Sequence, residues 1–354
     1  MSSILLTEEN ISQIPISSPQ REALNLSIAA ELRANFDYDF EKFWQWSGVV
    51  KNDTSPVVLA AKLTGAYHSL EKGLTLEEPR ALFGRSKVKF IIRAVRALEK
   101  IGYTSVATRG GRGTIQDYMR FHKEHHYSLP ADYEKELRDF VSERDGLFPG
   151  GAVLLTKKEV QNATAFDYTR FVQTRHSIRH YTGESVSPEQ IKLAVSRAIH
   201  TPRAVNRETR RVYVAYDTVL RNHVLKYQHG NIGFGHKLGA VLIITTDIRE
   251  FDIIGERNQA WIDGGLFAMG LNFALHADNL GTCMLNWSAD KEQDQALRSA
   301  FEIPEYEVII TMLGVGSLPE SLRVAASPAP VADDILSVIK PRFGLEAMPP
   351  AGRR

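Results

Sequence analysis

One stretch of the sequence, Arg-His-Ser-Ile-Arg-His-Tyr at residues 175–181, points most directly to the fold. It gathers four cationic or protonatable side chains and a serine hydroxyl within about two helical turns. On a helix, residues four apart share a face, so Arg175 and Arg179 are predicted to converge on one anion, with Ser177 as a neutral donor. Guanidinium groups bind phosphate through paired hydrogen bonds and keep their charge. The stretch indicates a site for an anionic cofactor, or else a solvated basic face before a loop.

Two later segments add to this pattern. Residues 201–206, Thr-Pro-Arg-Ala-Val-Asn, directly follow a predicted helix at about 188–200, which begins with a hydroxyl cap at Ser187, Pro188 in the first turn and Gln190. Residues 280–283, Leu-Gly-Thr-Cys, connect a long apolar helix to a short strand. Glycine at position 281 lets the backbone approach a ligand closely, although it is also typical of an ordinary helix end.

The three segments together resemble the nitroreductase family of flavin enzymes, over about residues 165–340. The resemblance implies an α+β fold in which a central mixed or antiparallel sheet is flanked by helices. It also implies an oxidoreductase that passes electrons from NAD(P)H or a biosynthetic intermediate through N5 of FMN to a small organic substrate, with NAD(P)H as the expected reductant, and a homodimer whose flavin sites are shared by both chains. The residues that it places around FMN are Arg175, His176, Ser177, Arg179, Pro202, Ala204, Asn206, Gly281, Thr282 and Arg323.

The chain departs from the family pattern at three positions. Arg203 stands where a small hydroxyl is usual, Glu208 where Gln is usual and Ala329 where Arg or Lys is expected, so Arg323 is the candidate replacement near the phosphate. Arg203 either polarises the flavin or substrate or pairs with Glu208 at the surface. These departures keep two alternatives open: a redox-inactive binding or regulatory module of the same fold, and an enzyme that consumes the flavin.

Composition is that of an ordinary globular protein with two domains or one elaborated domain, because 354 residues exceed the roughly 100–200 of one domain. A formal charge of +1 gives no reason to expect nucleic acid or acidic membranes as partners. The apolar runs are shorter than the ~20 residues of a membrane helix, and no secretory signal is apparent. The single cysteine, Cys283, is predicted to be inert core in a cytoplasmic protein.

Hydrophobic spacing divides the chain into residues 1–160, a helical N-terminal region, residues 161–340, the nitroreductase-like FMN-binding domain, and a tail at 341–354. Helices are predicted at 21–46, 57–74 and 87–101, and again from 130 to 143. The glycine-rich residues 102–114 are predicted to form a loop, either a phosphate cradle or a mobile surface turn. In the second part, strands are predicted at 211–216, 240–245 and 308–314, and a helix at 258–279 whose glycines 264, 265 and 270 suggest close contacts.

Two histidine-containing motifs lie in the N-terminal region. His122 and His126 are spaced like helical metal ligands, but they lack a third ligand, so we expect a solvated helical face and no metal site. His68, Glu71 and Lys72 come together near the end of a predicted helix. They form either a site for an acidic ligand or a polar helix end capped by Gly73.

Overall fold

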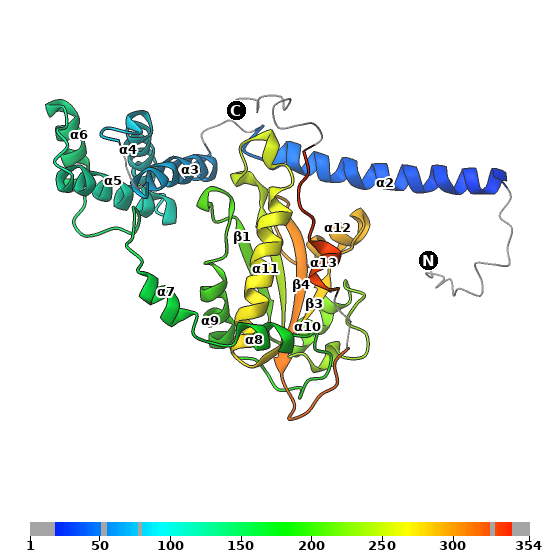
Figure 1. Cartoon of the computed structure of the whole chain (residues 1–354). Coiled ribbons are helices and arrows are strands. Elements are labelled where there is room, and N and C mark those ends of the chain that lie inside the picture. Colours follow the sequence, from blue (N-terminus) through cyan, green and yellow to red (C-terminus); the bar gives the residue numbers. More distant parts are fainter. Residues whose placement is uncertain (1–17, 51–54, 77–79, 326–329, 342–354) are drawn as a thin grey trace.

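The computed structural model describes residues 18–50, 55–76, 80–325 and 330–341. The first half of this described chain is helical, as predicted (Figure 1). Two short helices then lead past residues 175–181, which we call the signature stretch, to the second half. The helices of the first half and this connection are α2 (Ser18–Trp46), α3 (Pro56–Leu74), α4 (Arg85–Lys100), α5 (Val106–Glu124), α6 (Ala131–Ser142), α7 (Lys157–Ala163) and α8 (Tyr168–Thr174).

The second half is built on one antiparallel sheet whose described strands lie in the order β1-β2-β4-β3. The predicted α+β fold with a central sheet is therefore confirmed. Its strands are β1 (Arg210–Ala215), β2 (Ala240–Asp247), β3 (Leu280–Asn286) and β4 (Glu307–Ser317). The remaining helical elements are α9 (Pro188–Ala198), η1 (Ala204–Asn206), α10 (Thr218–Leu225), η2 (Gly235–Lys237), η3 (Ile248–Glu250), η4 (Ile254–Glu256), α11 (Gln259–Ala277), α12 (Lys291–Ala300) and α13 (Ala332–Ile335).

Helices cover both faces of the sheet. Alternate residues of β2 point to opposite faces, so Val241 and Ile243 join a core with α10 and α12, whereas Leu242 and Ile244 join a core with α9 and α11. All residues of β2 are buried, which confirms the prediction of a strand covered on both sides.

The predicted cap at the start of α9 is also confirmed. Ser187 Oγ accepts a hydrogen bond of 3.2 Å from the backbone N–H of Gln190, and α9 begins at Pro188. The helix begins at the predicted residue because the side-chain oxygen satisfies a backbone donor that has no partner within the helix.

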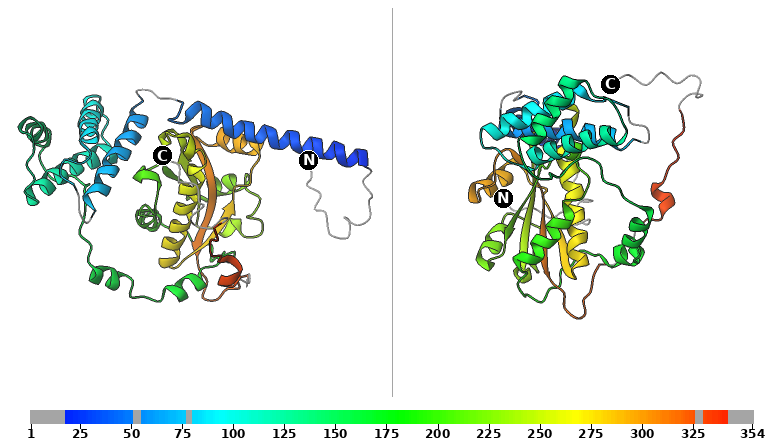
Figure 2. Two further views of the ribbon diagram at one scale, coloured as in Figure 1. Left: turned by 45° about the horizontal axis from the view of Figure 1, so that its top comes forward. Right: turned by 90° about the vertical axis from the view of Figure 1, so that its left-hand side faces the viewer.

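The helices α3 to α6 pack around a core of their own, apart from the cores of the sheet. The figures show this cluster beside one end of the sheet (Figure 2). It meets the second half through α3, which packs against η1 and η3. The helical cluster therefore lies against the end of the sheet at which η1 and η3 are found.

The prediction of a glycine-rich loop at residues 102–114 is wrong. Residues from Val106 onward form α5, and its glycines are buried in helix contacts. A Cβ on Gly110 would lie 2.8 Å from the ring of Tyr67, and one on Gly113 would meet the carbonyl oxygen of Pro149. The glycines serve close packing between helices, which outweighs their low helix propensity, and this stretch presents no phosphate cradle.

The expected solvated face around His122 is also wrong. His122 is buried, and the backbone N–H of Leu82 donates to its Nε2 at 3.0 Å. Nδ1 therefore carries the proton and donates to the carbonyl oxygen of Tyr118 at 2.8 Å. Burial, the largest effect, lowers the pKa of His122. Nδ1 thus bonds within α5, and Nε2 joins α5 to the segment before α4.

The glycines of α11 partly meet the prediction of close contacts. A Cβ on Gly264 would touch the side chain of Ile310 on β4, and one on Gly270 would touch Thr201. Gly265 has nothing within 4 Å and lies on the outer face of the helix. Two of the three glycines therefore serve packing inside the molecule.

Candidate functional site

The signature stretch is extended, so the prediction that Arg175 and Arg179 share a helical face is wrong. The preceding helix α8 ends at Thr174. The backbone N–H of Ile178 donates to the carbonyl oxygen of Thr282 at 2.7 Å, which fixes the stretch alongside β3. Hydrogen bonding to β3 replaces the local bonds that a helix would need.

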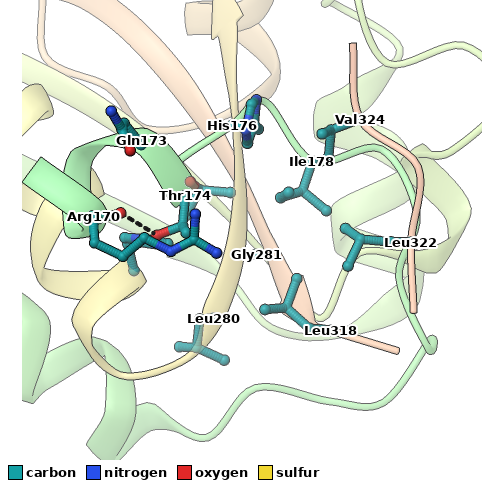
Figure 3. A pocket seen from close by; sticks show the side chains of 12 residues that line it. Arg170, Gln173, Thr174, His176, Ile178, Leu280, Gly281, Leu318, Leu322 and Val324 are labelled. Atoms are coloured by element: carbon teal, nitrogen blue, oxygen red, sulfur yellow. Dashed lines mark hydrogen bonds between the residues drawn. The ribbon is translucent and has the colours of Figure 1, made fainter. Parts of the chain in front are cut away.

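A cavity of about 310 Å³, which we call the signature cavity, lies where this stretch meets β3 and the segment after β4. Figure 3 shows polar side chains of Arg170, Gln173 and Thr174 on one side and apolar side chains, among them Ile178 and Leu318, on the other. The predicted cofactor residues that line the cavity are His176, Gly281 and Thr282, whereas Arg175, Ser177, Arg179 and Arg323 lie outside its lining.

The backbone at the start of β3 is held tightly. Thr282 is buried, and its hydroxyl donates to the side-chain oxygen of Asn272 on α11. A Cβ at Gly281 would lie 2.8 Å from Leu318 and 3.1 Å from Ile178. The small residue at position 281 therefore lets this apolar wall form against the backbone.

Positive charge is concentrated around this cavity without acidic partners. Its lining contains no carboxylate, and Arg170, Arg175, Arg179 and Arg323 form no ion pair with any residue in the described ranges. Burial lowers the pKa of His276, and the charges of Arg175 and His176 lower it further, against the hydrogen bond to Phe171. Unpaired guanidinium groups beside a concave surface are the arrangement that binds an anion.

The second predicted motif lies at the other end of α11. The backbone N–H of Ala204 donates to Asp263 Oδ2 at 2.9 Å, whereas Nε2 of His276, which lines the signature cavity, donates to the carbonyl oxygen of Phe171 on α8 at 3.1 Å. Asp263 and His276 are separated by about 20 Å along the helix. A single chain therefore does not bring Pro202, Ala204 and Asn206 to the cavity of residues 176 and 281–282.

The backbone of η1 is strained. Val205 has φ of 52° and Asn206 has φ of 58°, in the left-handed region that residues other than glycine rarely adopt. For a β-branched residue such as Val205 this conformation is an outlier, and strain of this kind costs of order 1–3 kcal/mol. The conformation presents Asn206 toward α3, where its side-chain Nδ2 lies 3.0 Å from His68 Nδ1.

Arg203 adopts the surface pairing that was one of its two predicted roles. Its Nε lies 3.6 Å from Glu208 Oε2, and its Nη1 donates to the carbonyl oxygen of Ile199 at 3.0 Å, at the end of α9. Glu208 is held more closely by Arg210, with two hydrogen bonds of 2.8 Å. Ala329, the third departure from the family pattern, lies outside the described residues.

Cys283 is buried, and burial raises the pKa of its thiol, as expected of an inert core residue. The polar end predicted at His68 is not capped by Gly73, because α3 continues to Leu74 and Gly73 packs against the ring of Phe83. His68 and Glu71 do come together, with Nδ1 3.4 Å from Oε2. In the described residues, no group of three or more His, Cys, Asp or Glu side chains is arranged to hold a metal ion.

A second cavity, of about 220 Å³, lies between the helical cluster and the sheet and was missed by sequence reasoning. We call it the interdomain cavity; its polar lining comes from Thr64, Tyr67, Tyr103, Ser105, Asn206, Glu208, Arg211 and Glu250. Glu250 comes shortly after the buried strand β2 in the sequence. This position is a signal that could have marked it as a charged residue held close to the core. Its partners are distant in sequence, so their meeting depends on tertiary packing.

Part of the chain is similar to a known protein family. The model of the Nitroreductase family matches residues 172–235, a segment that includes the signature stretch and the second motif. No curated protein sequence matches the chain. Residues 172–235 thus carry the predicted nitroreductase resemblance.

Solved structures to which the chain is similar include a nitroreductase family protein from Streptococcus pneumoniae TIGR4, at 17% identity and a TM-score of 0.42, covering 49% of this chain and 100% of that one. Another is a nitroreductase of Desulfovibrio desulfuricans solved in complex with FMN, at 21% identity and a TM-score of 0.43, covering 50% and 100%. A third is an FMN-dependent nitroreductase of Clostridium difficile R20291, at 19% identity and a TM-score of 0.38, covering 44% and 91%. None of the helices in the described ranges is both long and apolar enough to cross a membrane.

Proposed function

We propose that this protein is an FMN-dependent oxidoreductase of the nitroreductase type. The observation that carries the proposal is the set of arginines on the segments that form the signature cavity, Arg170 in its lining and Arg175, Arg179 and Arg323 next to lining residues in the sequence, none of which has an acidic partner within the described ranges. Guanidinium groups that the protein leaves unpaired can bind an anionic ligand, and the phosphate of FMN supplies one. The match of residues 172–235 to the Nitroreductase family supports the same conclusion.

The proposed cofactor residues divide into two groups. Arg175, Arg179 and Arg323 hold the phosphate through charge, while His176 and Thr282 border the cavity with groups that donate or accept hydrogen bonds. Ser177 and Gly281 belong with this first group. Pro202, Ala204 and Asn206 form the second group and contact the cofactor from the other end of α11. When bound, the flavin supplies the transfer of hydride or single electrons to a small organic substrate, and NAD(P)H is the proposed reductant.

The distance between these two groups leads us to propose a homodimer. Because the groups lie at opposite ends of α11 in one chain, a complete site takes one group from each of two copies. The outer face of α11 supports this arrangement, since Trp261, Ile262, Leu266 and Met269 are exposed there around Gly265. A helix that is apolar on its solvent side is typical of one that is covered in the functional assembly.

The arm formed by α2 also supports the proposed homodimer. It extends away from the body of the protein (Figures 1 and 2). Apolar side chains recur every four residues along it, and all are at least 47% exposed: Leu24, Ile28, Leu32, Phe36, Phe40 and Trp44. Neighbours four apart in a helix lie next to each other, about 40° apart around its axis, so the arm carries a continuous apolar stripe that winds gradually around it. We propose that this stripe packs against the second copy of the chain.

The division into residues 1–160, 161–340 and 341–354 is proposed on the same basis. The cluster α3 to α6 has a core separate from the cores around the sheet, which supports a boundary between the two. The end of α2, however, is held by Lys42, whose Nζ lies 3.1 Å from Asp294 on α12. The helical region therefore has two attachments to the flavin domain, one through α2 and one through α3.

The experiment that tests the proposed function is the visible absorption spectrum of the freshly purified full-length protein, recorded again after incubation with FMN and removal of the excess. Flavin bands that stay with the protein, and that bleach on addition of NADH or NADPH, are expected. A protein that retains no flavin contradicts the proposal and favours the redox-inactive binding module. Loss of FMN with appearance of a flavin fragment, after reduction in the presence of oxygen, identifies a flavin-consuming enzyme instead.

A further inference from the structure

His68, which the proposed function leaves without a role, lies between two partners that need opposite protonation states. We propose that His68 is a positioning residue for η1: when neutral it holds Asn206 in place, and when protonated it bonds to Glu71 and releases Asn206. The inference deepens the proposed function, because Asn206 is one of the proposed cofactor residues. Only the consequence for FMN binding rests on that function, since the change of partner involves residues of the chain alone.

The two partners of His68 meet at one ring nitrogen. Nδ2 of Asn206 lies 3.0 Å from Nδ1 of His68, and Oε2 of Glu71 lies 3.4 Å from the same atom. The amide group of Asn206 donates, so its contact needs an unprotonated Nδ1, whereas the carboxylate of Glu71 accepts and needs a proton there. Protonation of His68 therefore exchanges one partner for the other.

Glu71 is held in a position to accept from His68. Its other oxygen, Oε1, accepts hydrogen bonds from the backbone N–H of Gly151 at 3.2 Å and from the hydroxyl of Thr114 at 3.3 Å. The side chains of His68 and Glu71 are only 20% and 17% exposed. Water and salt screen partly buried charges less than exposed ones, so Glu71 favours the charged form of the imidazole.

The turn that His68 holds is the strained one at Val205 and Asn206. Backbone with positive φ is retained only where the surrounding contacts require it. Asn206 is held from one side by Nε of Arg203, which donates to its carbonyl oxygen at 3.1 Å, and from the other side by His68. Guanidinium groups keep their charge, whereas imidazoles titrate between about pH 5 and 8, so only the contact with His68 responds to pH in this range.

Other charged side chains lie on the elements that pack against α3. They are Lys72 on α3 itself, Lys87 on α4, Asp117 on α5, Arg203, Arg207 and Glu208 at or beside η1, and Arg249 and Glu250 on η3. Each of these except the exposed Lys72 has a hydrogen-bond or ion-pair partner of its own in the described part of the chain. Burial, and then the charge of Asp247, raise the pKa of Glu250 to about 8, so Glu250 carries little charge at neutral pH. Glu71 is therefore the charge that acts most directly on His68.

The first test is the protonation of the two ring nitrogens of His68. The full-length protein is labelled with ¹⁵N-histidine, and its ring nitrogen signals are recorded by NMR between pH 5 and pH 8, with those of His68 assigned by their loss in His68→Asn. At pH 8 we expect Nε2 to carry the proton and Nδ1 to be unprotonated, and at pH 5 we expect a proton on both. A proton on Nδ1 at pH 8 overturns the proposal, because Asn206 then has no acceptor there.

The second test is hydrogen exchange at residues 204–207, measured by mass spectrometry and corrected for the intrinsic effect of pH on exchange. In the native protein the corrected exchange is expected to be about three- to tenfold faster at pH 5 than at pH 8, which corresponds to the loss of one hydrogen bond. His68→Asn keeps an acceptor oxygen near the position of Nδ1 but does not titrate, so this difference is expected to disappear. Glu71→Gln, which removes the charge that favours protonation, is expected to move the transition to lower pH.

His223→Asn is the matched control, because His223 is exposed on α10 and bonds only to the carbonyl oxygen of Val219. It is expected to keep the pH response of the native protein. An equal pH response in the native protein and in His68→Asn overturns the proposal.

FMN titration at pH 6 and pH 8 tests the consequence for the cofactor. The native protein is expected to lose more affinity on acidification than His68→Asn. The phosphate of FMN also gains a proton in this range, and the comparison between the two proteins removes that effect. An equal loss in both overturns the positioning role. A protein that changes partner at His68 but binds no FMN keeps the change of partner and loses the proposed function, whereas FMN binding with no response of His68 to pH does the opposite.

Discussion

Asn206 and His68, which are 138 residues apart, meet where the helical cluster touches the sheet: the side-chain Nδ2 of Asn206 lies 3.0 Å from Nδ1 of His68. The amide nitrogen can only donate, so Nδ1 of His68 accepts and its proton lies on Nε2. Glu71 Oε2, 3.4 Å from the same Nδ1, gains a hydrogen bond only when Nδ1 is protonated. The two contacts therefore compete for one nitrogen.

Asn206→Ala and His68→Ala are each expected to lower the free energy of unfolding by about 0.5–1.5 kcal/mol, the net value of one hydrogen bond. The double variant is expected to lose less than the sum, because both substitutions remove the same contact. Urea denaturation measures these differences, with Asn286→Ala as a control whose side chain bonds only to nearby Ser288. Strictly additive losses would show that the two residues do not act on each other.

Arg175→Ala and Arg179→Ala are each expected to weaken FMN binding roughly 10–100-fold, since a hydrogen bond to a charged group contributes about 1.5–3 kcal/mol. Titration of the flavin absorbance or fluorescence measures the change. Arg138→Ala is the matched control, because Arg138 lies on the surface of α6 and pairs with Glu134. Equal affinity in all three variants would remove the phosphate role assigned to the signature stretch.

The sequence predicted best those features that depend on neighbouring residues. The cap at Ser187 and the apolar run of β2 are local, and both are confirmed. The stretch at 175–181 was predicted to lie on a helix or its C-terminal turn because its own spacing allows this, but α8 ends at Thr174 and the backbone N–H of Ile178 bonds to Thr282 on β3. Gly113 was predicted in a loop because the carbonyl of Pro149, which demands a residue without Cβ, is not visible in a local pattern.

In the candidate site, too, the predictable residues differ from those whose positions depend on tertiary packing. His176, Gly281 and Thr282 were predicted by resemblance and do border one cavity. The separation of Asn206 from them by the length of α11 was not predictable, since motif spacing in sequence does not say which chain completes a site. Glu250 carries no motif at all, and its surroundings are assembled from both halves of the chain.

Gly113→Ala is expected to destabilise the protein by about 1–3 kcal/mol, the usual cost of forcing extra atoms into a packed interior. The added Cβ meets backbone oxygen atoms of Phe148 and Pro149, which cannot rotate away as a side chain would. Thermal or urea unfolding measures the loss. Gly255→Ala serves as the control, because nothing lies within 4 Å of its Cβ position. Unchanged stability of Gly113→Ala would mean that α5 and the 148–149 segment are not packed as described.

Asp294 is expected to make the attachment of α2 sensitive to acid. Burial by itself favours the protonated form, but the hydrogen bond and charge of Arg298, with the charge of Lys42, prevail and lower the pKa of Asp294 to about 2. A lowered pKa contributes stability above the unfolded value near 4, and this contribution, about 2 kcal/mol, is lost as pH falls from about 4 to about 2.

Urea unfolding of the native protein and of Asp294→Asn, compared between pH 6 and pH 2, measures this contribution. The variant is expected to be less stable at pH 6 and to show a shallower decline with acid. Asp139→Asn is the control, because its pair with Lys135 is exposed and contributes little. Parallel pH profiles for the native protein and Asp294→Asn would exclude Asp294 as the source of the acid sensitivity.

Leu266→Glu is expected to convert the proposed homodimer into monomers. The side chain is 43% exposed at the centre of the apolar face of α11, next to Gly265, where a second copy can approach closely. A carboxylate buried there without a partner costs several kcal/mol in the dimer and almost nothing in the free chain. Sedimentation velocity measures the oligomeric state, and Val219→Glu, an exposed position on α10, is the control.

The same variant separates assembly from cofactor binding. If each flavin takes residues from two chains, monomeric Leu266→Glu also loses FMN, although Arg175 and His176 are unchanged. The loss of flavin and the loss of the dimer are then expected to follow one concentration dependence when the native protein is diluted. A Leu266→Glu monomer that holds FMN as tightly as the native protein would show that one chain suffices for the site and that Asn206 serves the interdomain cavity alone.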